Sequence, residues 1–222
     1  LECKLKEKTP SRIANLHSIS VGQPLRFGSM QVEFFPVSHS IPDATGIAIR
    51  TPLGVVVHTG DFKIDHTPVD GNPSDFRALA GLAPDGAFLL LSDSTYAEIE
   101  GYTPSEQVVA DSLDSVIRDA QGRVLIATFA SLISRIQMAI DSGSRYGRKV
   151  AVLGRSMVNN ARIALDMGYL ADPGKVLIDI DRANKLDPSQ VIIVTTGSQG
   201  EPMGAMMRIA SYVHPDVLIE KG

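Results

Sequence analysis

The sequence predicts an α/β protein in which a strand-rich part precedes a part that alternates strands with helices. Short apolar runs separated by turn residues fill the first hundred residues, whereas from about residue 103 each strand-length run is followed by a helix-length segment. Strands that alternate with helices form a parallel sheet with helices on its faces. We therefore expect one domain over residues 1–100 and a second over residues 101–222.

Three strand regions are predicted in the first part. One hairpin joins residues 24–27 to residues 30–37, and a second joins residues 46–50 to residues 55–58. The run 87–91 contains only apolar residues, which predicts a strand buried on both faces.

The second part begins with a predicted helix over residues 103–120. Thr103 is its expected N-cap, and Glu106 stands three residues later, as in a capping box. The remaining predicted elements are strand 123–128, helix 131–146, strand 149–153, helix 157–167, strand 191–194 and helix 202–212.

Composition excludes several classes of protein. The chain has 222 residues, of which 44% are hydrophobic and 21% charged, as in an ordinary globular protein. Its single cysteine, Cys3, excludes a disulfide framework, so we expect a cytoplasmic protein. Its apolar runs are only strand-length, so we expect no membrane span. The net charge of -4 gives no general attraction for nucleic acids, which leaves local patches or metal ions to make any such contact.

His39 and Asp61 are candidate metal ligands because each follows a predicted strand directly. An imidazole nitrogen and a carboxylate oxygen are both zinc ligands, and an aspartate can bridge two hydrolytic zinc ions. A catalytic zinc needs at least three protein ligands, however, and none of the five histidines lies two residues from another. Asp61 could instead cap a turn, as could Asp93 after the strand 87–91.

The other histidines and acidic loop residues have simpler interpretations: a strand-facing side chain for His58, surface loop positions for His66 and His214, and solvated carboxylates for Asp65, Asp70 and Asp75.

Three turns between a strand and a helix in the second part carry hydroxyl groups, glycines or an arginine. In a parallel sheet these turns lie at one edge, where backbone amides and hydroxyls can bind phosphate groups. Phe129 could stack on a base, and Arg135 could add positive charge. The candidate nucleic-acid-binding residues are Phe129, Ser131, Arg135, Arg155, Ser156, Ser198 and Gln199.

Motifs distributed along nearly the whole chain resemble the ribonuclease J family of metallo-β-lactamase/β-CASP nucleases. They occur in the family's order and are His39-Ser40-Ile41-Pro42-Asp43, Thr51-Pro52-Leu53-Gly54, His58-Thr59-Gly60-Asp61-Phe62-Lys63, Leu91-Ser92-Asp93-Ser94-Thr95, Ala127-Thr128-Phe129-Ala130-Ser131, Gly154-Arg155-Ser156-Met157 and Thr196-Gly197-Ser198-Gln199-Gly200-Glu201-Pro202. The resemblance implies a partial metallo-β-lactamase sandwich followed by a β-CASP domain that is incomplete at its C-terminal side.

The same resemblance implies a function and its residues. His39 would ligate one zinc ion, Asp61 would bridge two, and Asp93 would hydrogen-bond active-site histidines. The expected activity is cleavage of single-stranded RNA from the 5′ end and internally, in the cytoplasm. The expected metal is zinc, with manganese as the alternative, and the intact protein is expected to be a homo-oligomer.

Two motifs of the family are absent from the 222 residues: the His-x-His-x-Asp-His metal loop and the Ser-Gly-His-Ala phosphate-binding motif. We therefore expect the chain to be an internal segment of a longer enzyme and to be inactive by itself. Two alternatives remain open. One is a doubly wound nucleotide- or RNA-binding module without catalysis, although such a module predicts a G-x-G-x-x-G signature and this sequence contains none. The other is a scaffold or oligomerisation segment.

Overall fold

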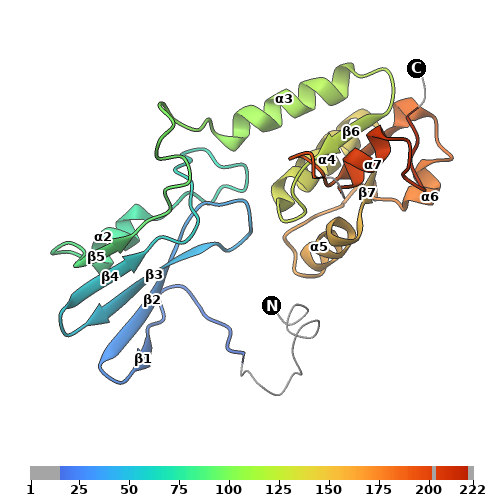
Figure 1. The fold of residues 1–222 in the computed structure, drawn as a ribbon. Helices are drawn as coiled ribbons and strands as arrows, with labels where there is room; N and C mark the ends of the chain where they lie inside the picture. The colour runs from blue at the N-terminus through green and yellow to red at the C-terminus, as the bar shows by residue number, and fades with distance from the viewer. Residues whose placement is uncertain (1–15, 202–203, 220–222) are drawn as a thin grey trace.

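The computed structural model describes residues 16–201 and 204–219. It shows a strand-rich lobe and a helical lobe, with helix α3 (Glu106–Asp119) leading from the first to the second (Figure 1). No helix in the described part of the chain is both long enough and apolar enough to cross a membrane.

The strand-rich lobe contains one five-stranded sheet in the order β1-β2-β3-β4-β5. Neighbours from β1 to β4 are antiparallel, and β5 pairs with β4 in parallel. Both predicted hairpins are confirmed, with Phe27 opposite Met30 in the first and Thr51 opposite Gly54 in the second. The strands are β1 (Leu25–Phe27), β2 (Met30–Pro36), β3 (Thr45–Thr51), β4 (Gly54–His58) and β5 (Leu89–Leu91).

A short helix that was not predicted, α2 (Phe76–Leu82), covers part of this sheet. Seven residues are too few for an isolated helix to be stable in water, so packing must hold it. Its apolar side chains contact the buried residues Phe35, Val37 and Val57. Asp75 caps its N-terminus by accepting a hydrogen bond of 2.8 Å from the amide of Ala78.

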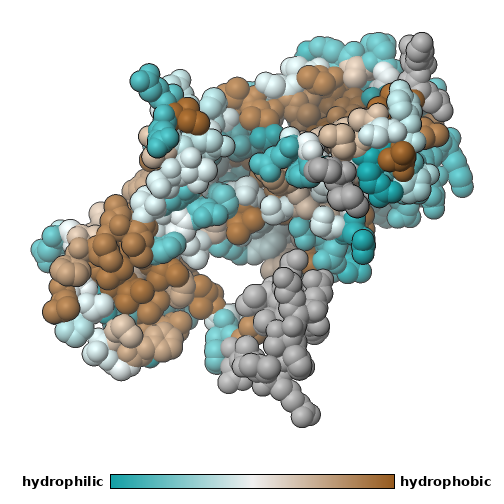
Figure 2. All heavy atoms as spheres, viewed as in Figure 1, coloured by the Kyte–Doolittle hydropathy of each residue, from teal (hydrophilic) through white to brown (hydrophobic). Residues whose placement is uncertain are grey.

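The predicted burial of strand β5 is wrong for the described residues. Leu89, Leu90 and Leu91 are each about half exposed, at 46%, 57% and 46%. An apolar run indicates that a strand needs covering, but it does not identify the covering element. In the described part of the chain β5 is an edge strand that pairs only with β4, and hydrophobic surface gathers on this lobe (Figure 2).

The helical lobe confirms the predicted parallel sheet flanked by helices. Its strands follow the order β6-β8-β7, and both pairings are parallel. The elements are β6 (Val124–Ala127), α4 (Ile133–Tyr146), β7 (Lys149–Leu153), α5 (Arg155–Asp166), α6 (Ile180–Ala183), a short 3-10 helix η1 (Pro188–Gln190), β8 (Val191–Thr195) and α7 (Ala205–Ala210), of which α6 and η1 were not predicted.

The central strand β8 separates two hydrophobic cores. All five of its residues are buried, and successive side chains point to opposite faces of the sheet. Ile192 and Val194 pack with residues of α3, α4 and α5, whereas Val191 and Ile193 pack with residues of α6 and α7. The lobe is therefore a three-layer α/β/α arrangement, which fixes the strand ends firmly in space.

The start of helix α3 differs from the prediction. Ser105 is the N-cap, with its hydroxyl accepting a hydrogen bond of 3.1 Å from the amide of Gln107, so the proposed Thr103 capping box is wrong. The helix therefore starts two residues later than the prediction. Glu106 thereby becomes the first helical residue, and its carboxylate is free to pair with side chains of other elements.

Candidate functional site

The loops that carry His39, Asp61 and Asp93 meet at one edge of the five-stranded sheet. Strands β2 and β4 both pair antiparallel with β3, so they run in the same direction and end at the same edge. Strand β5 runs parallel to β4 and ends beside it. The three candidate residues follow these three strand ends, and the topology therefore brings them together.

His39 and Asp61 point toward each other across this edge. The His39 Nε2 atom lies 3.8 Å from the Asp61 Oδ2 atom. Two ligands of one tetrahedral zinc ion lie about 3.4 Å apart, given metal-ligand distances of about 2.0–2.1 Å, so the pair needs little movement to share an ion. The His39 side chain is 29% exposed and that of Asp61 is 81% exposed, which leaves the carboxylate open to an incoming group.

The turn before Asp61 depends on its glycine. Gly60 has φ of 64°, and an added Cβ would lie 3.0 Å from a backbone carbonyl oxygen of β3. Its amide donates a hydrogen bond of 2.9 Å to His58 Nδ1. The buried hydroxyl of Thr59 accepts a hydrogen bond of 3.0 Å from the Asp93 amide. These contacts fix the direction in which the chain presents Asp61.

Asp93 is held in its charged form by hydrogen bonds. The hydroxyl and the amide of Thr95 donate to its Oδ1 atom at 2.6 and 2.9 Å, and the Phe62 amide donates to its Oδ2 atom at 3.4 Å. The Thr95 hydroxyl is the main cause of a pKa below the usual value for an aspartate. Asp93 is thus an anion beside the loop that carries Asp61.

The residues present fit part of a zinc site. One imidazole and one carboxylate converge, whereas catalytic zinc takes at least three protein ligands. Within residues 16–201 and 204–219, no group of three or more His, Cys, Asp or Glu side chains is placed to hold a metal. His39 and Asp61 would therefore be two ligands of a larger set.

Two further predictions about polar residues are wrong. Asp65 is only 4% exposed and is not a solvated loop carboxylate, and His214 is only 7% exposed and is not a surface residue. Burial lowers the pKa of His214, whose Nδ1 atom accepts a hydrogen bond from the Asp216 amide. His66 and Asp70 are exposed, as predicted.

The predicted nucleic-acid-binding turns lie together at one edge of the parallel sheet. Six of the seven candidate side chains are exposed there, after the C-terminal ends of strands β6, β7 and β8. The side chain of Asn160 in α5 donates a hydrogen bond of 2.9 Å to the Ala130 carbonyl, which joins the turn after β6 to helix α5. The six residues are Phe129, Ser131, Arg155, Ser156, Ser198 and Gln199.

Arg135 is placed differently from the other six. Its Nε and Nη2 atoms donate hydrogen bonds of 3.1 and 2.9 Å to the carboxylate of Glu106 in α3. The charge of Arg135 is therefore already paired inside the protein.

The same edge offers donors to an anion. Helices α4 and α5 are 14 and 12 residues long, and neither has a side-chain hydrogen bond at its N-cap. The amides at the starts of such helices attract negative groups. The Thr195 hydroxyl at the end of β8 is fully buried and has no hydrogen-bond partner among the described residues.

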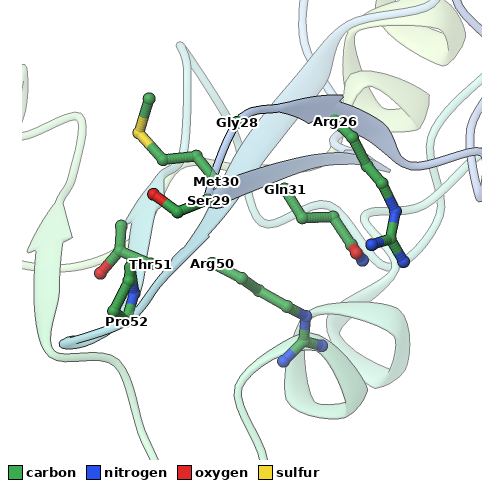
Figure 3. Close-up of a pocket in the computed structure, with 8 residues that line it drawn as sticks. All are labelled: Arg26, Gly28, Ser29, Met30, Gln31, Arg50, Thr51 and Pro52. Carbon is green, nitrogen blue, oxygen red and sulfur yellow. The ribbon is translucent and has the colours of Figure 1, made fainter.

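A shallow hollow at the opposite end of the strand-rich sheet does not belong to this site. It lies between the β1–β2 turn and the β3–β4 turn (Figure 3), whereas His39 and Asp61 follow the other ends of β2 and β4. Its Arg50 is already paired with Glu33 at 2.9 Å. The hollow is lined by Arg26, Gly28, Ser29, Met30, Gln31, Arg50, Thr51 and Pro52.

The loop that carries His39 also contacts the helical lobe. The Tyr169 hydroxyl, just after α5, donates a hydrogen bond to the Asp43 carboxylate. These residues are 126 positions apart, and no local pattern in the sequence indicates that they meet. The hydrogen bond to Asp43 is the main cause of a raised pKa of Tyr169, because a phenolate would lose this hydrogen bond and be repelled by the carboxylate.

Replacing Asp43 with asparagine is expected to lower the pKa of Tyr169 toward the ordinary value of 10.0. In the unsubstituted chain the Tyr169 contact stabilises the fold below about pH 10, and this contribution is lost as the pH rises through the higher folded-state pKa. Phenolate absorbance measured against pH checks the shift, with Tyr169→Phe identifying the signal. Asp85→Asn, at an exposed carboxylate, serves as control; equal titration curves for Asp43→Asn and the control would contradict the contact.

Comparisons with known proteins agree with this architecture. Residues 121–222 match the family model of the ribonuclease J β-CASP domain. Proteins named ribonuclease J from Synechocystis, Thermus thermophilus and Mycobacterium tuberculosis are 44%, 46% and 45% identical over 100%, 94% and 90% of this chain. The aligned part is only 35%, 36% and 36% of those proteins, so the chain spans about a third of their length.

A solved structure also shares the fold. A protein of unknown function from Enterococcus faecalis aligns over 86% of this chain and 48% of its own length, with a TM-score of 0.59 and 17% identity. The three-layer lobe and the family match together define a protein of the β-CASP class. More specifically, residues 121–222 match the β-CASP domain of ribonuclease J, and the chain as a whole is similar to about a third of proteins of that name.

Proposed function

We propose that this chain is part of a zinc-dependent ribonuclease that acts in RNA processing and decay by hydrolysing phosphodiester bonds. The observation that carries the proposal is the meeting of His39, Asp61 and Asp93 at one sheet edge, in a chain whose relatives are named ribonuclease J. We include both exonuclease action from the 5′ end and endonuclease action.

His39 and Asp61 are the residues of this chain that would hold metal. Asp61, with its carboxylate 81% exposed, is suited to bridging two ions, and His39 would bind one of them through Nε2. When bound, the two ions supply an activated water and stabilise negative charge on the phosphate. Because the relatives are about three times as long as this chain, we infer that the remaining ligands come from sequence outside it.

Asp93 would act by orienting other groups in the active site. Its carboxylate is charged and fixed by Thr95 and by the Phe62 amide, next to the proposed bridging residue. A fixed anion at this place favours one orientation of a neighbouring imidazole and stabilises the protonated form of the ring.

Single-stranded RNA is the proposed substrate. The exposed turns at the edge of the parallel sheet offer hydroxyls, the Arg155 charge and backbone amides for phosphates, and the 45% exposed Phe129 ring for a base. Such contacts are local, which suits a chain whose net charge of -4 gives no long-range attraction for RNA. We further propose a cytoplasmic homo-oligomer, with manganese as a possible substitute for zinc.

Replacing His39 with alanine is expected to weaken zinc binding by about 100-fold in a protein extended to the length of the relatives, because one direct ligand is lost. Calorimetric zinc titration measures the affinity, and cleavage of a 5′-labelled single-stranded RNA measures the activity. His66→Ala is the matched control, because His66 is an exposed loop histidine. Unchanged zinc affinity in His39→Ala, or an extended protein that binds no zinc and cuts no RNA, would refute the proposed function.

A further inference from the structure

The two loops that carry the candidate metal ligands are joined to each other. The Lys63 amide, two residues after Asp61, donates a hydrogen bond of 2.8 Å to the carbonyl of Ser38, the residue before His39. A displacement of either loop therefore moves the other. An element that holds Lys63 therefore also restrains the loop that carries His39.

The loop after Asp61 reaches the start of helix α3 in the helical lobe. The Asp65 carboxylate, whose side chain is fully buried, accepts hydrogen bonds of 2.8 Å from the Glu106 amide and 3.0 Å from the Thr67 amide. The hydroxyls of Thr67 and Ser105 are hydrogen-bonded to each other at 2.9 Å, which closes the junction. The helix start is thus built partly by the strand-rich lobe.

Charged groups extend this junction to helix α4. The Lys63 ammonium lies 3.3 Å from the Glu106 carboxylate and 3.6 Å from that of Asp65. Glu106 also accepts the two hydrogen bonds from Arg135. All three side chains in the Lys63–Glu106–Arg135 chain of contacts are 21–26% exposed, so solvent screens these contacts less than contacts at an open surface.

A second connection holds the His39 loop from the other side. Asp43 accepts a hydrogen bond from Tyr169, and its backbone is in the left-handed region with φ of 54°. A non-glycine residue adopts this conformation at a cost, which its surroundings must offset. The Tyr169 hydroxyl is one contact that holds the loop in this shape.

We propose that Glu106 and Tyr169 are positioning residues. Through them the helical lobe holds the loops that carry His39 and Asp61 in the relative position that metal binding requires. Each loop has its own anchor, and the Lys63–Ser38 hydrogen bond links the two anchored loops. The proposal rests on the proposed function for the metal, but the positioning itself is measurable without metal or RNA.

Hydrogen exchange on the 222-residue chain tests the positioning. Glu106→Gln keeps the shape of the side chain and removes its charge, and Tyr169→Phe removes only a hydroxyl. Each is expected to speed amide exchange in loops 37–44 and 59–67 by about tenfold, because a charge-assisted hydrogen bond is lost. The controls are Asp111→Asn, at an exposed carboxylate of the same helix, and Tyr212→Phe, at an exposed tyrosine.

The zinc requirement of an extended protein tests the link to the metal site. Tyr169→Phe is expected to raise the zinc concentration for half-maximal RNA cleavage by about tenfold, because a residue that supports a metal ligand affects metal affinity. The cleavage rate at saturating zinc should be nearly unchanged. Tyr212→Phe should leave the zinc requirement unchanged. Unchanged exchange in both loops overturns the proposal, and so does faster exchange with an unchanged zinc requirement. Faster exchange in an extended protein that never cleaves RNA would instead refute only the nuclease function.

Discussion

Replacing Asp61 with asparagine is expected to lower the rate of RNA cleavage by about 10³-fold or more in a protein of the relatives' length. The proposed bridging carboxylate serves both metal ions, and metal ions supply several kcal/mol of transition-state stabilisation. An amide has one neutral oxygen and lacks the charge that binds two cations. The measurement is the cleavage rate at saturating RNA, together with the zinc content of the purified protein.

The substitution is a clean probe because Asp61 contributes little to the fold. Its side chain is 81% exposed, and the turn that presents it is fixed by Thr59 and Gly60. Asp70→Asn is the matched control, since Asp70 is an exposed loop carboxylate nine residues later. An Asp61→Asn protein that keeps its zinc and cleaves RNA within threefold of the control would remove Asp61 from the active site.

The parallel sheet was predictable because its signals are local. The predicted strand 191–194 is a continuous apolar run, and its burial on both faces follows from the helices that precede and follow it in the sequence. The meeting of His39 with Asp61 was only partly predictable. The β1–β2 and β3–β4 hairpins were predicted, but the antiparallel pairing of β2 with β3, which makes β2 and β4 run in the same direction, was not.

Contacts between the lobes were beyond prediction for a physical reason. Asp65 resembles any loop aspartate followed two residues later by threonine, and its partner at the Glu106 amide is 41 residues away. Its burial depends on where helix α3 starts, and that start is at Glu106, with Ser105 and not Thr103 as the N-cap. The half-exposed strand β5 shows the same limit, because composition reports that a strand is apolar but not what covers it.

Replacing Asp65 with asparagine is expected to lower the free energy of unfolding by about 2–4 kcal/mol. The buried carboxylate accepts hydrogen bonds from the amides of Glu106 and Thr67, and the Lys63 ammonium lies 3.6 Å away. An asparagine side chain has only one oxygen, so one buried amide loses its acceptor and Lys63 loses a counter-charge. Urea unfolding of the 222-residue chain measures the change, and Asp70→Asn should change stability by less than about 0.5 kcal/mol.

The difference between Asp65→Asn and the unsubstituted chain should also depend on pH. Burial alone would raise the pKa of Asp65, but hydrogen bonds from the Glu106 amide, Ser105 and Thr67 and the charge of Lys63 together hold it below the ordinary value of 3.8. A carboxyl group with a lowered folded-state pKa stabilises the protein above its unfolded pKa, and this contribution is lost as the pH falls through the folded-state pKa. The two proteins should therefore differ most near neutral pH and converge below about pH 3.8. A difference that stays constant from pH 7 to pH 3 would show that the charge of Asp65 does not hold the start of helix α3.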